Sequence, residues 1–492
     1  MPISGAEPLH TAGLLLSLGV LLAVSVWSSR FAGRLGVPVA LLFLLVGVAA
    51  GSEGLGGIFF DNFSLSFRLG TLALVLILFD GGLNTPIHHV RPVLLPAAVL
   101  ATLGVAITAM VVAVGGRWLG LTWLQAGLLG AIVSSTDAAA VFSVLRTSGV
   151  RLRQRLSSTL ELESGLNDPL AVILTIEFAG ILLGERRSVW MIVGEVALEL
   201  AIGAASGYVF GMAGRWLVRR ARLSASGLYP VLTLGLALAA FGAPTFVHGS
   251  GFLSVYVAGI VFGAGRFPQR ATLLRVHDGG AWLAQVGMFM LLGLQVVPSR
   301  LLAVSFEGIA ITLVLGFIAR PLAVALCLLP FKYSRREVLF LGWSGLRGAV
   351  PIVLATYPVL AGVPGAPRLF NLVFFVVVLS ALVPGATVRW AARRLGLAVD
   401  TGPAAAAPLE MNALIDLDSD LLSFNLAPAA AASGVAIADL PLPEESGVIA
   451  VVRGRMLLAP KPETVLQAGD AVYLACRDED QALMRLIFGR EE

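Results

Sequence analysis

Long apolar segments separated by short polar stretches make up most of the chain. Thirteen can be delimited, at residues 11–29, 37–51, 68–83, 92–114, 122–146, 157–184, 188–218, 226–241, 250–264, 279–297, 303–329, 335–358 and 368–391. A helix that crosses a membrane needs about 20 mainly apolar residues. The pattern therefore predicts an all-α polytopic membrane protein with about 13 transmembrane helices.

The composition supports a membrane protein over a large soluble one. Of the 492 residues, 57% are hydrophobic and 13% are charged, whereas soluble domains carry about 25% charged residues. No Lys or Arg precedes the first apolar run, although a cleaved signal peptide would have a basic start, so we interpret 11–29 as a true span. Cys327 and Cys476 indicate neither a disulfide framework nor a metal site.

The basic residues are distributed unequally between the two sets of loops. With the N-terminus outside, about 20 Lys and Arg fall on one side of the membrane and about 6 on the other. Cytoplasmic loops carry the excess of positive charge. We therefore expect a multi-pass membrane protein with its N-terminus outside and its C-terminal region in the cytoplasm, and we expect no nucleic-acid partner.

Two of the predicted spans are interrupted by polar or helix-breaking residues. Ser134-Ser135-Thr136-Asp137 lies in the middle of the fifth segment, and Gly345-Leu346-Arg347-Gly348-Ala349-Val350-Pro351 lies in the twelfth. Broken helices at corresponding places in two halves indicate a transport site. If segments 1–6 repeat as 8–13, the two breaks correspond, and the odd offset makes the repeat inverted. Alternatively, the Gly and Pro residues here merely permit close packing or a kink.

The composition changes after Arg394. We assign residues 1–396 to a transmembrane exchanger domain, 397–408 to an Ala/Pro-rich linker and 409–492 to a small cytoplasmic α/β domain. Strand-like runs occur at 448–452, 456–458 and 471–476, and residues 479–488 are typical of a helix. No motif for a dinucleotide or a triphosphate is present, and we expect no cofactor.

Asp168 is the best candidate for an exchanged site, because a carboxylate at membrane depth is costly and by default functional. Such a group can hold either a proton or a small cation. Ser164 lies four residues earlier, on the same helical face, and could supply a second oxygen to a monovalent cation. Asn167 could supply a carbonyl or tie the broken backbone together. Alternatively, Asp168 is a structural residue that caps a helix before Pro169.

Thr136 and Asp137 interrupt the fifth segment. Carbonyl groups and helix dipoles at such a break can coordinate or stabilise ions. Asp137 could instead neutralise two helix N-termini, and we keep both interpretations open.

Three further charges need partners. Arg347 requires a carboxylate at membrane depth, and Glu163 is the natural partner in a structural ion pair. Arg320 is a second arginine within a span; it either stabilises the proton-loaded state or balances the charge of Asp137. Asp80, near the cytoplasmic end of the third span, is either an entry-path ligand or an ordinary interfacial acid.

Motifs for an enzyme are lacking. The Gly342-Trp343-Ser344-Gly345 run is not a complete nucleophile elbow, and HExxH is absent. We therefore expect a transporter and not an enzyme.

At these residues the chain resembles the cation:proton antiporter-1 family, the NhaP-type Na⁺/H⁺ and K⁺/H⁺ exchangers. The resemblance covers residues 11–394 and rests on Ser135-Thr136-Asp137, Glu163-Ser164-Gly165-Leu166-Asn167-Asp168-Pro169 and the 345–351 segment. It implies thirteen spans, a homodimer, crossed broken helices and one-for-one electroneutral exchange.

The resemblance also implies a role for each matching residue. Asp168 would be the carboxylate that binds the proton and the cation, Ser164 and Thr136 would be cation ligands, and Asp137 would stabilise the helix crossing. Asn167 would tether the core, and Glu163 with Arg347 would form the buried ion pair. The match of Asp80 to the family's acidic ligand in the third span depends only on its flanking residues.

The C-terminal region resembles a regulator-of-K⁺-conductance C-terminal (TrkA-C-like) domain. The similar residues are Asp439-Leu440-Pro441-Leu442-Pro443, 448–453, Pro460 and Leu466-Gln467-Ala468-Gly469-Asp470. Antiporters with such domains resemble the K⁺/H⁺ subgroup, so we favour potassium over sodium and expect that a small-molecule regulator could bind here.

Two other classes of function remain as alternatives. A ligand-gated K⁺ channel would need a filter of carbonyl rings, and no TVGYG-like run is present. A membrane-tethered sensor would lose all activity on deletion of residues 401–492, whereas an antiporter would keep transport with altered regulation.

Overall fold

The computed structural model describes residues 7–265, 267, 269–399, 419–443, 446–454 and 456–489. The chain divides into two compact units: Met1–Arg220, Pro230–Gly265 and Val276–Val399 in one, Ala221–Tyr229, Arg266–Arg275 and Asp400–Glu492 in the other. Most of the expected linker, and the expected start of the C-terminal domain at residue 409, lie outside the described residues.

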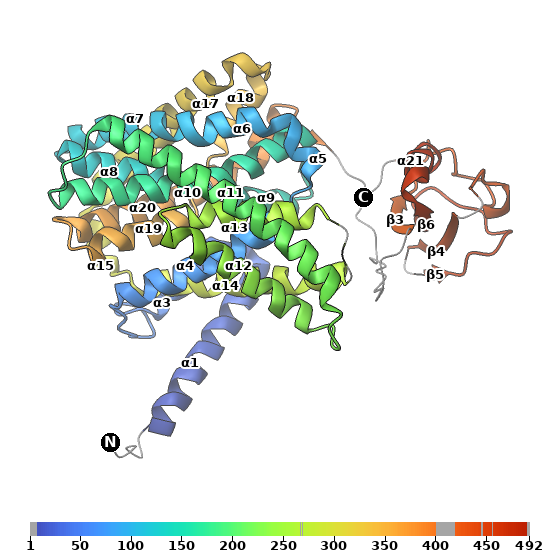
Figure 1. Cartoon of the computed structure of the whole chain (residues 1–492), viewed down its shortest axis with the longest axis horizontal. Helices are drawn as coiled ribbons and strands as arrows, with labels where there is room; N and C mark the ends of the chain where they lie inside the picture. The colour runs from blue at the N-terminus through green and yellow to red at the C-terminus, as the bar shows by residue number, and fades with distance from the viewer. Residues whose placement is uncertain are drawn as a thin grey trace. The chain divides into compact units, whose positions relative to one another are not determined.

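The part of the chain up to residue 394 is almost entirely helical (Figure 1). The helices are α1 (Glu7–Ser28), η1 (Ser29–Phe31), α2 (Ala32–Leu35), α3 (Val39–Ala50), α4 (Phe63–Leu83), α5 (Ile87–Val90), η2 (Arg91–Val93), α6 (Leu94–Val99), η3 (Leu100–Gly104), α7 (Val105–Trp118), α8 (Trp123–Val133), α9 (Ala138–Thr147), α10 (Gln154–Leu182), α11 (Val189–Ala221), α12 (Leu228–Phe246), α13 (Gly251–Gly263), α14 (Arg270–Leu294), α15 (Pro298–Ala303), α16 (Ser305–Val314), η4 (Leu315–Ala319), α17 (Arg320–Leu328), η5 (Leu329–Phe331), α18 (Arg335–Trp343), α19 (Ala349–Leu360) and α20 (Ala366–Arg394). Two short strands, β1 (Arg151–Leu152) and β2 (Ala398–Val399), pair antiparallel.

Every one of the thirteen predicted apolar segments coincides with helical residues. Within the described chain, eight helices are long and apolar enough to cross a membrane, and α8 with α9 makes a ninth if the bent pair counts as one span. The helices α3, α13 and α19 are apolar but contain only 12, 13 and 12 residues. Counting these shorter helices as spans gives twelve, and the expected thirteenth, segment 279–297, falls largely in α14, which is not one of the eight.

Helices α8 and α10 lie at the centre of the large unit. From Ala126 to Val133, α8 is completely surrounded by protein, as its uniformly apolar sequence predicts. It packs against α7 and α10, and α10 in turn packs against α6, α13 and α19. The residues proposed as the site lie on these central elements.

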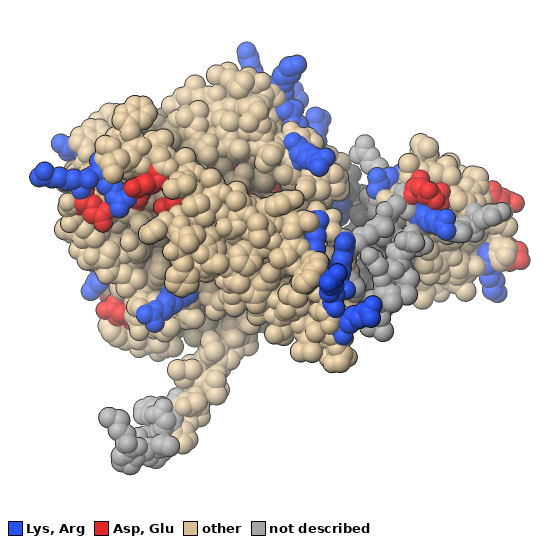
Figure 2. All heavy atoms as spheres, viewed as in Figure 1, with Lys and Arg blue, Asp and Glu red and all other residues tan. Residues whose placement is uncertain are grey.

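The outer helices present apolar side chains to their surroundings. Helix α11 buries mainly one stripe, made of Gly203, Gly207, Gly211, Gly214 and Val218. A Cβ atom at Gly207 would lie 2.5 Å from the carbonyl oxygen of Ser254, so only glycine permits this approach of α11 to α13. Charged side chains are sparse on the face of the helical unit shown in Figure 2. Such a surface suits a protein surrounded by lipid.

Both predicted breaks are present. Helices α8 and α9 are separated by residues 134–137 and bent by 42°. Helices α18 and α19 are separated by residues 344–348. The chain is therefore a mostly helical, multi-span membrane protein with two broken helices.

The C-terminal unit contains a four-stranded antiparallel sheet of order β3-β6-β4-β5. Its strands are β3 (Ser419–Asn425), β4 (Gly447–Arg453), β5 (Met456–Leu458) and β6 (Ala471–Arg477). The short helix η6 (Ile437–Asp439) lies between β3 and β4, and η7 (Asp478–Asp480) and α21 (Gln481–Phe488) follow β6. Phe424 packs against Phe488 in its core, and Arg453 forms a bidentate ion pair with the buried Asp470. The predicted strands and helix are confirmed; β3 was not predicted.

Candidate functional site: the crossing of two broken helices

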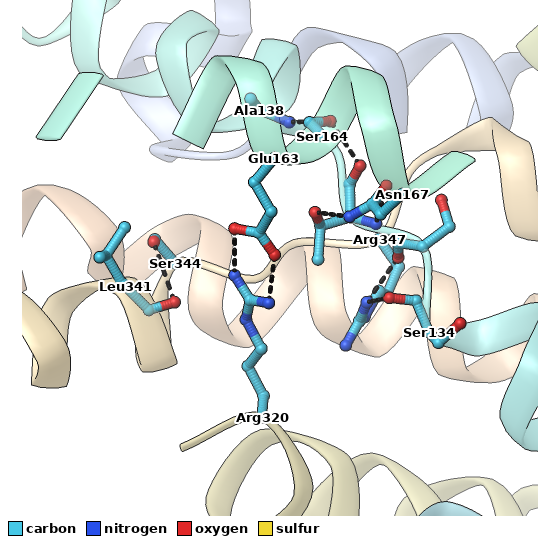
Figure 3. A network of polar contacts seen from close by, with 11 residues as sticks. Ser134, Ala138, Glu163, Ser164, Asn167, Arg320, Leu341, Ser344 and Arg347 are labelled. Carbon is cyan, nitrogen blue, oxygen red and sulfur yellow. Dashed lines mark hydrogen bonds and ion pairs between the residues drawn. The ribbon is translucent and has the colours of Figure 1, made fainter. Parts of the chain in front are cut away.

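The two breaks meet in the middle of the helical unit. The backbone N–H of Asp137 donates to the carbonyl oxygen of Leu346 at 2.8 Å and joins one break to the other. In each break the backbone leaves the helix for several residues, which frees N–H and C=O groups that need partners. Figure 3 shows the side chains that supply them.

Asp137 lies at the N-terminal ends of α9 and α19, the second halves of the two broken helices. Its Oδ1 accepts the backbone N–H of Ala140 at 2.9 Å, which caps the N-terminus of α9. A Cβ atom at Gly348 would fall among the carboxyl atoms of Asp137, with only 2.7 Å to Cγ, so the carboxyl group also lies against the residue that begins α19. A negative charge at two helix N-termini is electrostatically favourable.

The side chain of Arg347 lies at the C-terminal end of α8, the first half of the first broken helix. Its Nη1 donates to the carbonyl oxygens of Ser134 at 2.6 Å and Ser135 at 2.5 Å, where α8 stops. A positive charge is favourable at a helix C-terminus. The side chain is 2% exposed, and its Nε and Nη2 have no hydrogen-bond partner among the described residues.

The predicted pairing of Glu163 with Arg347 is wrong. Glu163 forms its bidentate ion pair with Arg320: Nη2 donates to Oε2 at 2.7 Å, and Nη1 contacts Oε1 (Figure 3). Glu163 is 1% exposed and Arg320 is 4% exposed. Because Arg347 is occupied by the carbonyl groups of the first break, Glu163 is left to the arginine of α17, and Arg320 balances Glu163 and not Asp137.

Asp168 faces the first break from α10. It is 8% exposed, and its Oδ1 accepts the hydroxyl of Ser135 at 2.5 Å. Helix α10 continues through Pro169 to Leu182, so Asp168 lies inside a continuous helix and not at a cap before the proline. The capping alternative for Asp168 is therefore wrong.

Ser164 and Asn167 hold α10 against the same break. The hydroxyl of Ser164 donates to the carbonyl oxygen of Thr136 at 2.6 Å and accepts the N–H of Ala138 at 3.2 Å. Asn167 Nδ2 donates to Thr136 Oγ1 at 2.6 Å, and its Oδ1 accepts the Thr136 N–H at 3.4 Å. The structure thus brings together Asp168, Ser164, Asn167, Thr136 and Asp137 (this last through the shared break).

Asp80 lies apart from this network in the described structure. It is on the last turn of α4, partly exposed, and its Oδ1 accepts Nδ2 of Asn84 at 3.0 Å. The sequence analysis missed Ser135 as a contact of Asp168. Its place beside Thr136 in a polar run was a signal, but the run contains two serines and does not say which one faces α10.

The site is a membrane-embedded carboxylate held at a crossing of two broken helices, which defines an ion transporter of the secondary type. The chain matches the sodium/hydrogen exchanger transmembrane family over residues 19–394 and the TrkA-C domain over residues 421–489. The chain belongs to the sodium/hydrogen exchanger family and carries a C-terminal TrkA-C domain. It is a transporter and not an enzyme.

Several relatives align with nearly the whole chain. It is 42% identical over 469 residues to the K(+)/H(+) antiporter NhaP of Alkalimonas amylolytica, covering 95% of this chain and 81% of the relative. It is 40% identical over 479 residues to the K(+)/H(+) antiporter NhaP2 of Shewanella sp. strain ANA-3, covering 96% and 83%. The fold resembles that of the sodium proton antiporter MjNhaP1 of Methanocaldococcus jannaschii, with a TM-score of 0.68, 24% identity, and coverage of 77% of this chain and 98% of that one.

Proposed function

We propose that this protein exchanges K⁺ for H⁺ across the bacterial inner membrane, with Asp168 as the group that carries both ions in turn. The names of the relatives support the choice of ions. The observation that carries the proposal is the buried Asp168 carboxylate, which faces the oxygen-rich break 134–137.

The fixed charges around Asp168 balance one another. Glu163 is paired with Arg320. Asp137 at the helix N-termini and Arg347 at the end of α8 add one negative and one positive charge. The remaining charge is that of Asp168, which one proton or one monovalent cation neutralises. Since an uncompensated charge at membrane depth is costly, the site favours states that hold one or the other, which gives electroneutral one-for-one exchange.

In this scheme the cation is bound by the Asp168 carboxylate together with oxygens of Ser164 and Thr136. The Ser164 hydroxyl is held by hydrogen bonds to the break, and the Thr136 hydroxyl accepts a hydrogen bond from Asn167 of α10, so each keeps an oxygen lone pair for a hard cation. Asn167 tethers Thr136 to α10, and Asp137 stabilises the crossing. Asp80, on the last turn of α4, is a candidate for the entry path.

The remaining features of the proposal follow from the loops and from the family. The excess of arginine in one set of loops supports a cytoplasmic C-terminal domain and an external N-terminus. We expect a homodimer, and we expect the TrkA-C domain to regulate exchange in response to a small molecule.

The test is cation-dependent dissipation of a pH gradient by the full chain in proteoliposomes. K⁺ and Na⁺ are compared for the wild type, for Asp168→Asn, and for Glu307→Gln, which removes a carboxylate from the more exposed pair with Arg368. A K⁺ response that is lost in Asp168→Asn and kept in Glu307→Gln is expected. A response to Na⁺ alone would reverse the choice of cation, and full exchange by Asp168→Asn would refute the role of this carboxylate.

A further inference from the structure

The side chain in closest hydrogen-bonding contact with the Asp168 carboxylate is one that the family resemblance does not assign. Ser135 is 1% exposed, and its hydroxyl lies 2.5 Å from Asp168 Oδ1. The proposed cation ligands Ser164 and Thr136 make their hydrogen bonds to the backbone of the break and to Asn167. Ser135 therefore occupies a position at the carboxylate itself.

The backbone of the break directs Ser135 toward α10. Arg347 Nη1 holds two successive carbonyl oxygens, those of Ser134 and Ser135, and thereby fixes the orientation of this stretch of chain. The neighbouring hydroxyl of Ser134 turns back to the carbonyl oxygen of Ala131 at 2.7 Å. Only the second serine of the pair reaches Asp168, and its placement depends on a guanidinium from the other broken helix.

We propose that Ser135 is a positioning residue whose hydroxyl donates to the unprotonated Asp168 and competes with an incoming proton, and that Arg347 acts on Asp168 by holding Ser135 in place. The inference rests on the proposed function, because it concerns the same carboxylate. A proton that binds at Oδ1 displaces the Ser135 donor. The hydroxyl therefore sets how strongly protons compete with K⁺.

Few other charged groups act on Asp168. Asp137 at the first break and Tyr256 of α13 interact with it electrostatically. Glu163 lies about one turn earlier on α10 and is paired with Arg320 of α17. The sequences of α6, η3, α8 and α19, all packed on α10, contain no Asp, Glu, His, Lys or Arg. The end of α4 contributes Thr85, which contacts Glu161 two turns before Asp168.

The test measures the pH profile of K⁺/H⁺ exchange by the full-length protein in proteoliposomes, with the apparent KM for K⁺ and the maximal rate at each pH. In Ser135→Ala the carboxylate loses a donor, so protons compete more strongly. We expect half-maximal exchange to move to higher pH by about one unit, and the apparent KM for K⁺ at the acidic end to rise about tenfold. Ser135→Thr keeps the hydroxyl and should restore most of the wild-type profile.

Two further variants separate this role from a structural one. Ser143→Ala removes a serine hydroxyl that bonds only Ala140 of its own helix, and its profile should coincide with the wild type. Arg347→Lys cannot hold both carbonyl oxygens in the same geometry, so it should shift the profile in the same direction, and Ser135→Ala should add little in that background.

The proposal is overturned if Ser135→Ala keeps the wild-type pH profile and KM, or if the shifts of Ser135→Ala and Arg347→Lys add in full. These outcomes are distinguishable from failure of the proposed function. If wild-type exchange is absent, or persists in Asp168→Asn, the function of the carboxylate is wrong; if exchange depends on Asp168 and ignores Ser135, only the present inference fails.

Discussion

Neutralising one member of the Glu163–Arg320 pair is expected to destabilise the protein strongly. The pair is bidentate, and its side chains are 1% and 4% exposed. Glu163→Gln leaves the Arg320 guanidinium in the core without a carboxylate, and its Nε already has no partner among the described residues. Breaking a buried pair in this way costs about 3–5 kcal/mol. Removing the exposed counterpart, Arg368 with Glu307, should cost at most about 1 kcal/mol.

The assay is a double-mutant cycle on thermal unfolding of the purified protein in detergent. Scans at one rate are compared, because unfolding of large proteins is often irreversible. The double variant Glu163→Gln/Arg320→Gln should lower the melting temperature by less than the sum of the two single variants, since neither charge then remains alone. The cycle of Glu163→Gln with Arg347→Gln should show a smaller coupling. Additivity in the first cycle and strong coupling in the second would refute the pairing and restore Arg347 as the partner.

Three other expectations concern separate parts of the chain. Gly348→Ala places a methyl group among the atoms of the carboxyl group that caps α9, so exchange should fall tenfold or more, whereas Gly235→Ala, with open space at its Cβ, should keep wild-type rates in the same proteoliposome assay. Deletion of residues 400–492 should leave cation-dependent exchange in place with a changed rate or pH profile; complete loss by a folded, inserted protein would instead make the C-terminal domain the working part. Hydrogen bonds from the N–H and hydroxyl of Ser299 lower the pKa of Glu53 below its ordinary value of 4.5, so the stability that this contact adds is present above that pH and lost as the pH falls through the lowered pKa. The melting temperatures of the wild type and Glu53→Gln should therefore converge on acidification from about pH 6 to pH 3, and a constant difference would contradict this account.

The elements that the sequence predicts well are those set by local pattern. Runs of apolar residues predict the helices, and polar or Gly/Pro interruptions predict the two breaks, because both signals lie within one segment of chain. The grouping of Ser164 with Asp168 was also predictable, since residues four apart lie on one helical face. Strand β3 (Ser419–Asn425) was missed, because its partner β6 is about fifty residues away and the segment before it is rich in Ala and Pro.

Partners between helices were harder to predict. Glu163 had two possible arginines, Arg320 and Arg347, and each lies in the interior of its apolar segment. Which of them reaches Glu163 depends on how α10, α17 and the second break pack together, and a uniformly apolar helix carries no periodic signal of its orientation. The same limit applies to Ser134 and Ser135, where the direction of a non-helical backbone decides which hydroxyl meets Asp168.

The arrangement of charges at the crossing explains how the charge of one carboxylate, that of Asp168, can change while the others stay fixed. Arg347 binds the carbonyl groups at the end of α8. The Arg320 side chain lies against Gly345, just beyond the end of α18, where a Cβ atom on that residue would be 2.9 Å from the Arg320 Nε. Both upstream half-helices thus end at an arginine, and both downstream half-helices begin at Asp137.

Asp137 and Arg347 are fixed by the helix ends, and Glu163 and Arg320 are fixed by each other. A change in the charge of any of them would leave a helix terminus or a buried partner uncompensated, which costs far more than protonating Asp168, whose side-chain partner within the described structure is one serine hydroxyl. Asp168 can therefore gain and lose a proton while the crossing keeps its structure, and this difference between fixed and variable charge is what an exchanger needs at its centre.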